Sequence, residues 1–197
     1  MQGSGRRVIA NDAAYGEIYY ESPSIPLFPL ARDAGVPYLE FFSFSKTFSV
    51  TGWRIGFAVG SPAVIGALAA LKANLDSGAY GAIQEAVAIV MRDGYDRVTD
   101  SIRARYRERR DELASLLSRA GFPVHAPRAT FYFWVPTPGG EPSIGFCRRL
   151  LEETGIVATP GIGFGDAGEG YFRLSITSGS DTIREAGRRL ARFARAG

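Results

Sequence analysis

The stretch that decides the fold runs Ser43-Phe44-Ser45-Lys46-Thr47-Phe48-Ser49-Val50-Thr51-Gly52-Trp53-Arg54-Ile55-Gly56-Phe57. The aromatic residues 38–44 before it predict one strand, and residues 53–60 predict a second short strand. Lys46 therefore follows a strand end, and Arg54 stands in an apolar setting that an unpaired guanidinium avoids. Because α/β proteins bind ligands at strand ends, this stretch is predicted to carry chemistry. A plain surface lysine is the competing interpretation of Lys46, although hydroxyl and aromatic residues surround it.

Lysine is used sparingly in this chain. Of 23 basic residues, 21 are arginine and two are lysine, at positions 46 and 72. A lysine amine, unlike a guanidinium, can lose its proton near neutral pH and attack a carbonyl. Each lysine is therefore a candidate nucleophile.

Composition places the chain among soluble globular proteins, with 46% hydrophobic and 22% charged residues and a net charge of +3. No apolar run approaches the roughly 18 residues of a membrane helix, and no apolar segment of signal-peptide length follows residues 1–7. The single Cys147 excludes an internal disulfide and fits a reducing compartment, so we expect a cytoplasmic protein. Because it lies in a helical stretch, Cys147 is predicted to be a buried thiol and not a nucleophile. No metal site is predicted.

Basic residues gather in residues 97–119, which raises the alternative of nucleic-acid binding. Apolar residues recur there at helical spacing, and acidic residues interrupt the positive run. Both features favour a long amphipathic helix with a solvated charged face. We therefore expect no nucleic-acid partner.

Period and turn signals predict an α/β protein whose last 75 or so residues form a smaller α+β unit, joined to the first part by the long helix. The predicted domains are residues 1–95 and residues 96–197. The predicted strands are residues 8–12, 38–44, 53–60, 130–135 and 171–177, and the predicted helices are residues 30–34, 62–75, 83–91, 97–119, 143–154 and 181–196. The apolar run 8–10 and the helix 83–91 are expected to be buried, and Gly121 is expected to cap the end of the long helix.

Four motifs in a fixed order identify a family. The lysine stretch resembles the signature of class I and II pyridoxal-phosphate-dependent aminotransferases, with an arginine eight residues after the lysine. Asn11-Asp12-Ala13-Ala14-Tyr15 resembles the upstream motif of that family. Pro160-Gly161-Ile162-Gly163-Phe164-Gly165 and Gly168-Glu169-Gly170-Tyr171-Phe172-Arg173-Leu174-Ser175 resemble its two C-terminal motifs. The motifs are most similar to those of the branch of LL-diaminopimelate aminotransferases and aspartate aminotransferase relatives.

The resemblance implies pyridoxal 5'-phosphate as cofactor and a lysine that binds its aldehyde. Lys46 is then the Schiff-base lysine and the proton shuttle between Cα and C4′. Asp12 pairs with the pyridine nitrogen, and Tyr15 pairs with the ring 3-oxygen. From the residues alone, Asp12 could equally cap a turn, and Tyr15 could be a core aromatic.

The remaining site residues are anion ligands. The resemblance implies that Ser43, Ser45 and Arg54 hold the cofactor phosphate and that Arg173 binds the α-carboxylate of the substrate. Planar bidentate guanidinium groups suit carboxylates and phosphates. A solvent-facing arginine in a strand is the ordinary alternative for Arg173.

The implied fold is the C-terminal part of a type I pyridoxal-phosphate-dependent transferase: part of the large-domain sheet plus the small α+β domain, in a homodimer. The implied reaction moves an amino group between an L-amino acid and a 2-oxo acid, for example that of LL-diaminopimelate aminotransferase in lysine biosynthesis.

Family members carry about as much sequence again upstream, so we expect a fragment that is inactive and poorly behaved alone; residues 1–5 resemble a start or linker. A non-catalytic aminotransferase-like module, such as the effector domain of a regulator, stays open as the alternative function. The residues that read substrate side chains lie largely upstream, so the exact substrate is not predicted.

Overall fold

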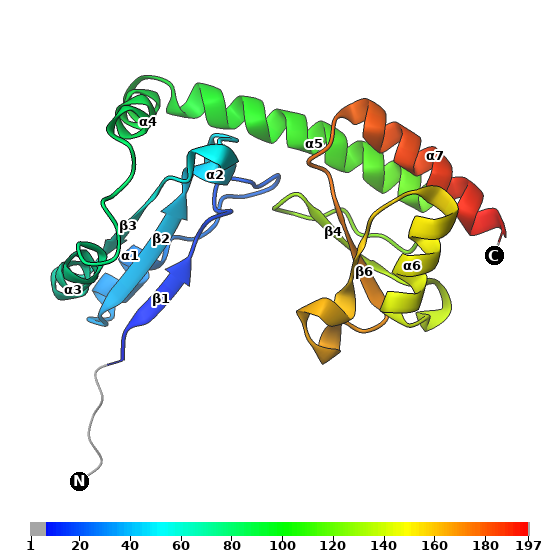
Figure 1. Cartoon of the computed structure of the whole chain (residues 1–197), viewed down its shortest axis with the longest axis horizontal. Helices are drawn as coiled ribbons and strands as arrows, with labels where there is room; N and C mark the ends of the chain where they lie inside the picture. Colours follow the sequence, from blue (N-terminus) through cyan, green and yellow to red (C-terminus); the bar gives the residue numbers. More distant parts are fainter. Residues whose placement is uncertain (1–6, 197) are drawn as a thin grey trace, which may run out of the picture. The chain divides into compact units, whose positions relative to one another are not determined.

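A computed structural model describes residues 7–196, with side chains described through residue 194. The chain divides into two compact units, Met1–Arg103 and Ala104–Gly197. The start or linker expected at residues 1–5 lies outside the described residues. Figure 1 shows an α/β arrangement with a small sheet in each unit, as the sequence predicts.

The sheet of the first unit has three strands in the order β1-β2-β3. Strand β1 (Ile9–Asp12) runs parallel to β2 (Tyr38–Ser43), and β2 runs antiparallel to β3 (Gly56–Gly60). Helices α1 (Leu27–Asp33) and α3 (Pro62–Lys72) pack against the sheet (Figure 1). The buried carboxylate of Glu40 accepts hydrogen bonds from the backbone N–H groups of Leu27 and Phe28, which attaches the start of α1 to β2.

Two predicted strand boundaries are wrong because the lysine stretch turns sharply. Phe44 does not extend β2, since it begins the short helix α2 (Phe44–Thr47). Residues 53–55 do not belong to β3. A 3₁₀ turn, η1 (Thr51–Trp53), precedes Arg54, whose φ of 51° is left-handed and ends the turn.

Two predictions of burial are also wrong. The apolar run that opens β1 was expected to be buried, but Ile9 is 43% exposed, because β1 is an edge strand among the described residues. Helix α4 (Gly81–Asp93) was expected to be buried as a whole. Val87 and Val90 pack on a cluster that includes Phe44 and Phe48, while Ile89 on another face is exposed.

Helix α5 (Tyr95–Arg119) is amphipathic as predicted. Its first turns belong to the first unit, and its later turns bury Leu113 and Leu117 in the second. After the helix, Gly121 adopts a φ of +84°, and the N–H of Phe122 bonds the carbonyl of Leu117. This C-terminal glycine cap was predicted, and only glycine adopts such a φ without strain. The domain boundary predicted at residues 95 and 96 falls at the start of α5, and the assignment to a large and a small domain stays a prediction.

The sheet of the second unit is antiparallel, in the order β4-β6-β5. Its strands are β4 (Tyr132–Pro136), β5 (Thr159–Pro160) and β6 (Tyr171–Ser175). Between β4 and β5 lie the 3₁₀ turn η2 (Pro138–Gly140) and helix α6 (Ser143–Thr154). The turns η3 (Gly161–Phe164) and η4 (Asp166–Gly168) lie between β5 and β6, and helix α7 (Ser180–Ala196) follows β6.

Alternation along β4 and β6 separates two faces. The inward side chains of Phe133, Val135, Phe172 and Leu174 are buried, and those between them are less so. Phe146 of α6 packs on Phe172, with ring centres 4.7 Å apart.

Cys147 is buried on α6, as predicted, and burial raises the pKa of its thiol. Within the described part of the chain, none of the helices combines the length and the apolar character needed to cross a membrane.

Candidate active site

The ends of β1 and β2 and the start of β3 lie at the same end of the first sheet. The parallel pairing places Asp12, the last residue of β1, opposite Phe41 near the end of β2. The antiparallel pairing places Ser43, the last residue of β2, opposite Gly56, the first residue of β3. The motif residues 12, 43–46 and 54 therefore all lie at this end of the sheet. The three strands are neighbours in the sheet, and their register brings these residues to the same end.

Helix α2 begins where β2 ends because Ser43 caps it. The Ser43 side chain accepts a hydrogen bond from the backbone N–H of Ser45 at 3.2 Å. Thr47 Oγ1 donates to the Ser43 carbonyl, and Thr51 Oγ1 donates to the Ser45 carbonyl. Ser45 is buried, and its hydroxyl has no hydrogen-bond partner within residues 7–196. These bonds fix the turn that presents Lys46.

Lys46 and Tyr15 face each other at this end of the sheet. The Lys46 amine lies 5.6 Å from the centre of the Tyr15 ring. Tyr15 belongs to a tight turn in which the N–H of Gly16 bonds the Ala13 carbonyl and the N–H of Ile18 bonds the Tyr15 carbonyl. Lys46 forms no ion pair with a described carboxylate, whereas the exposed Lys72 pairs with Asp76 four residues further on. Of the two lysines, Lys46 is the one whose amine is free of a described carboxylate.

Asp12 and Arg54 are both exposed. Asp12 Oδ1 accepts a hydrogen bond from the N–H of Ala14 at 3.3 Å, which is the turn-capping role that the sequence left open. Its other carboxylate oxygen has no bonding partner among the described residues. Arg54 donates to the Thr51 carbonyl and pairs with no described carboxylate, so its guanidinium keeps donors for an anion.

Arg173 lies in the second unit, on the less buried face of β6. Its guanidinium carbon is 4.2 Å from the centre of the Tyr132 ring and 4.6 Å from that of Phe164. Trp134 adds an edge-on contact to Phe164. The two rings hold Arg173 by cation–π contacts, and no described carboxylate neutralises it. Arg173 is therefore a positioned cation and not a freely moving surface arginine.

The loop that carries Phe164 is hydrogen-bonded to the start of α6. Glu169 accepts hydrogen bonds from the backbone N–H of Ser143 at 2.5 Å and from its hydroxyl at 3.2 Å. The same hydroxyl accepts a bond from the N–H of Ile162. Where the loop crosses itself, a Cβ on Gly161 would collide with the backbone of Gly168, so the backbones approach as only glycine allows.

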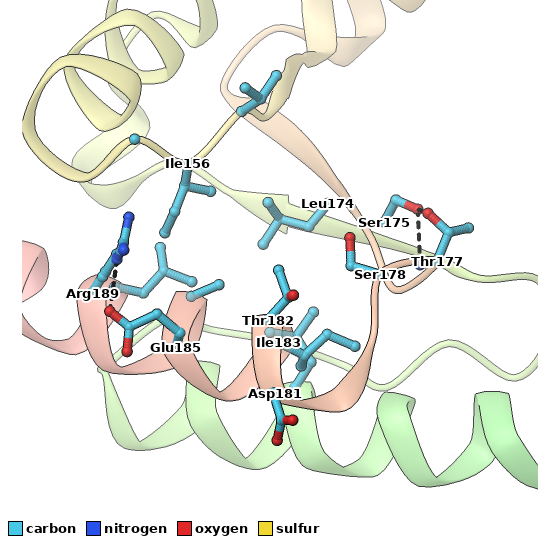
Figure 2. A pocket seen from close by; sticks show the side chains of 15 residues that line it. Ile156, Leu174, Ser175, Thr177, Ser178, Asp181, Thr182, Ile183, Glu185 and Arg189 are labelled. Carbon is cyan, nitrogen blue, oxygen red and sulfur yellow. Dashed lines mark hydrogen bonds and ion pairs between the residues drawn. The ribbon is translucent and has the colours of Figure 1, made fainter.

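A cavity of about 590 Å³ lies elsewhere in the second unit, between the loop after α6, strand β6 and helix α7 (Figure 2). Figure 2 shows Leu174 and Ile183 in its wall, with Glu185 and Arg189 paired at one side. None of the residues assigned to the site lines it; of the last motif, only Leu174 and Ser175 do. Its volume alone does not make it the site, since Lys46, Arg54 and Arg173 lie outside it.

Sequence reasoning missed the aromatic residues that hold Arg173. Tyr171, Arg173 and Ser175 share a face because side chains alternate along β6. Tyr132 joins them because it pairs with Ser175 across β4 and β6, which makes it a diagonal neighbour of Arg173. No short stretch of sequence specifies which strands pair, so the contact between Tyr132 and Arg173 could not be predicted. The aromatic composition of residues 130–135 was the one feature that pointed to it.

Comparison with known proteins agrees with this geometry. Residues 6–190 match the family of aminotransferases of class I and II. The chain is 46% identical over 190 residues to an LL-diaminopimelate aminotransferase of Nitratidesulfovibrio vulgaris (strain DP4), covering 94% of this chain and 48% of the relative. It is 42% identical over 186 residues to an LL-diaminopimelate aminotransferase of Aquifex aeolicus (strain VF5), covering 93% of this chain and 47% of the relative.

A solved structure is similar over the same half. LysN, an α-aminoadipate aminotransferase of Thermus thermophilus in complex with N-(5'-phosphopyridoxyl)-L-leucine, superposes with a TM-score of 0.83 at 31% identity. The match covers 96% of this chain and 50% of that one. The chain thus spans about half the length of the relatives it matches.

The fold is that of the aminotransferase class. The chain belongs to the class I and II aminotransferases, and its similarity to LL-diaminopimelate aminotransferases confirms the branch that the motifs indicated. Pyridoxal 5'-phosphate is the cofactor of this family. The residues present fit it chemically: Lys46 offers an unpaired amine, Ser45 a free hydroxyl, and Arg54 free donors among the described residues.

Proposed function

We propose that this chain carries the lysine-bearing part of an aminotransferase that moves an amino group between an L-amino acid and a 2-oxo acid. The observation that carries the proposal is the Lys46 amine, held 5.6 Å from the Tyr15 ring at the end of the sheet where Asp12 and Ser43 end their strands. When bound, pyridoxal phosphate supplies an electron sink for the bond cleavage at Cα.

In this proposal Lys46 Nζ would hold the cofactor by condensing with its aldehyde, with loss of water, and the same amine, once released, would move the proton between Cα and C4′. Asp12 keeps the pyridine nitrogen protonated, because a nearby negative charge favours the charged form of its partner. Tyr15 would donate from its phenol to the ring 3-oxygen, and the short distance between its ring and the Lys46 amine supports this role.

Anions are bound by the other site residues. Ser43, Ser45 and Arg54 hold the cofactor phosphate, and Arg173 binds the α-carboxylate of the substrate. Arg54 and Arg173 suit these anions because a guanidinium pairs with an oxyanion through two parallel hydrogen bonds. The rings of Tyr132 and Phe164 limit the rotamers of Arg173, which lowers the entropy lost when the carboxylate binds.

The relatives named LL-diaminopimelate aminotransferase support the proposed substrate class, which places the complete enzyme in lysine biosynthesis. The proposal includes the homodimer of the family, a cytoplasmic location, and the assignment of residues 1–95 to the large domain and residues 96–197 to the small domain. The chain covers about half of each relative, so the activity is proposed for the complete enzyme.

The test uses the two lysines as target and control. The 197-residue chain is incubated with pyridoxal phosphate, alone and mixed with the N-terminal half of the Nitratidesulfovibrio relative, reduced with borohydride and mapped by mass spectrometry. We expect the adduct on Lys46, and its loss in Lys46→Arg but not in Lys72→Arg. A label on Lys72, or none on Lys46 in the mixture, contradicts the proposal and favours a non-catalytic module. Transamination of LL-diaminopimelate by the mixture tests the substrate.

A further inference from the structure

A partly buried ion pair attaches the turn of Tyr15 to helix α5. Glu17, two residues after Tyr15, accepts a hydrogen bond from Arg103 at 3.0 Å. The Arg103 side chain is 12% exposed and also lies over the Tyr19 ring, 4.7 Å from its centre. A second carboxylate, Asp100, pairs with Arg103 from the solvent side, where it is 70% exposed. The pair with Glu17 is thus the better shielded from water, and a charge–charge contact is stronger there.

Tyr95 joins this pair to the opposite wall of the site. Burial, and then the nearby carboxylate of Glu17, raises the pKa of the Tyr95 phenol. The edge of its ring meets Phe48, with centres 6.0 Å apart. Phe48 closes α2, the helix that presents Lys46, and stacks on Phe44 within it. Helix α5 therefore contacts both walls: Arg103 holds Glu17 beside the turn of Tyr15, and Tyr95 contacts the helix of Lys46 through Phe48.

We propose that Glu17, Tyr95 and Arg103 are positioning residues that set the separation between Tyr15 and Lys46. The role rests on the proposed function, in which these two groups act on neighbouring atoms of one cofactor, Lys46 on the aldehyde and Tyr15 on the adjacent 3-oxygen. None of the three touches the reacting atoms in this scheme. Arg103 holds the turn through Glu17, and Tyr95 holds the helix of Lys46 through Phe48, so the start of α5 braces the two walls against each other. A general role in the stability of the first unit is the alternative that the experiment must exclude.

The first measurement needs no cofactor. Amide hydrogen exchange is recorded in the 197-residue chain for Gly16 and Ile18, whose N–H groups close the Tyr15 turn, and for the ladder between β2 and β3. In Glu17→Gln and Tyr95→Phe we expect exchange at the turn to rise at least about tenfold relative to the ladder, because the first change removes the charge that pairs with Arg103 and the second removes the phenol beside that carboxylate. Asp100→Asn is the matched control, since it removes only the exposed partner of Arg103, and should change the ratio less than about twofold.

The second measurement follows the site itself. The rate at which pyridoxal phosphate attaches to Lys46, read from absorbance and from the borohydride adduct, should fall at least about tenfold in Glu17→Gln and Tyr95→Phe. Arg103→Ala should lower it similarly, and Arg103→Lys should recover part of the loss because it restores the charge without the planar stacking.

The outcomes separate the two proposals. Equal acceleration at the turn and at the ladder means that the three residues only stabilise the unit, and unchanged exchange at the turn means that they do not hold it; either result overturns the positioning role. If the turn loosens as expected but wild-type chain, with or without the N-terminal half, takes no cofactor on Lys46, the proposed function fails while the structural brace stands. If Lys46 is labelled at the same rate in all variants, the brace does not serve the site.

Discussion

The guanidinium of Arg173 lies close enough to the face of Tyr132 for its central carbon to be 4.2 Å from the ring centre, although the two residues come from different strands. Phe164 approaches the same guanidinium at 4.6 Å. Contacts of this kind hold an arginine without consuming its hydrogen-bond donors, because the ring attracts the charge through its face. The donors of Arg173 are therefore available to an anion.

Arg173 should bind a carboxylate. In Arg173→Gln, the affinity of the chain for 2-oxoglutarate should fall at least about tenfold, because a bidentate charge-assisted pair is lost. The measurement is a chemical-shift titration of the 197-residue chain. Arg188→Gln is the control, since Arg188 is exposed and paired with Glu185. Equal weakening in both variants would show that the anion responds to net charge and not to the site.

The backbones of Gly161 and Gly168 lie too close together for a side chain to fit between them. Gly161→Ala places a Cβ against the backbone of Gly168, which must shift, and we expect a loss of about 1–3 kcal/mol in the free energy of unfolding of the second unit. Gly163→Ala is the matched control in the same loop, where a Cβ meets nothing within 4 Å. Urea denaturation followed by far-UV circular dichroism compares the two. A destabilisation of equal size in both variants rules out the close approach as the cause.

Glu169 should make the second unit sensitive to acid. The N–H of Ser143, then that of Gly170, lowers the pKa of Glu169 below its ordinary value of 4.5. Because the folded-state pKa is depressed, the stabilising contribution is present above about pH 4.5 and is lost as the pH falls through the folded value. Urea midpoints measured between about pH 6 and pH 3 should fall less steeply in Glu169→Gln than in the wild type, since the amide does not titrate.

Glu153→Gln serves as its control, because Glu153 is exposed on α6 and has no hydrogen-bond partner among the described residues. The prediction is wrong if Glu153→Gln flattens the pH dependence as much as Glu169→Gln does.

The first unit should self-associate. On β3, an edge strand among the described residues, Phe57 and Val59 share a face and are each more than a third exposed. An exposed apolar edge strand promotes pairing between chains, and a lysine at such an edge suppresses it. Sedimentation velocity at rising concentration should show oligomers of the wild-type chain and fewer of Val59→Lys. Leu75→Lys, at an exposed leucine outside any helix or strand, should leave the oligomers unchanged.

The sequence by itself determined the family and the order of the elements. Four motifs between residues 11 and 175 identify the aminotransferase family, because each fixes residue types at a spacing that the cofactor chemistry demands. Local periodicity predicted α6 with the bounds that the structure has, and the glycine cap of α5 at Gly121, because helix periodicity and a positive φ are properties of the nearby chain. The burial of Cys147 followed from the same local pattern.

Only the tertiary structure decided what lies beside what. Glu17 and Arg103 meet although the strands β2 and β3 and the helices α1 to α4 separate them in the sequence, and Tyr132 reaches Arg173 through strand register. The exposure of Ile9 was also beyond the sequence, because burial depends on which neighbours cover a strand and not on its apolar residues. Local sequence fixes the conformations that a segment prefers, whereas contacts between distant segments depend on how those segments pack, and no single segment encodes them.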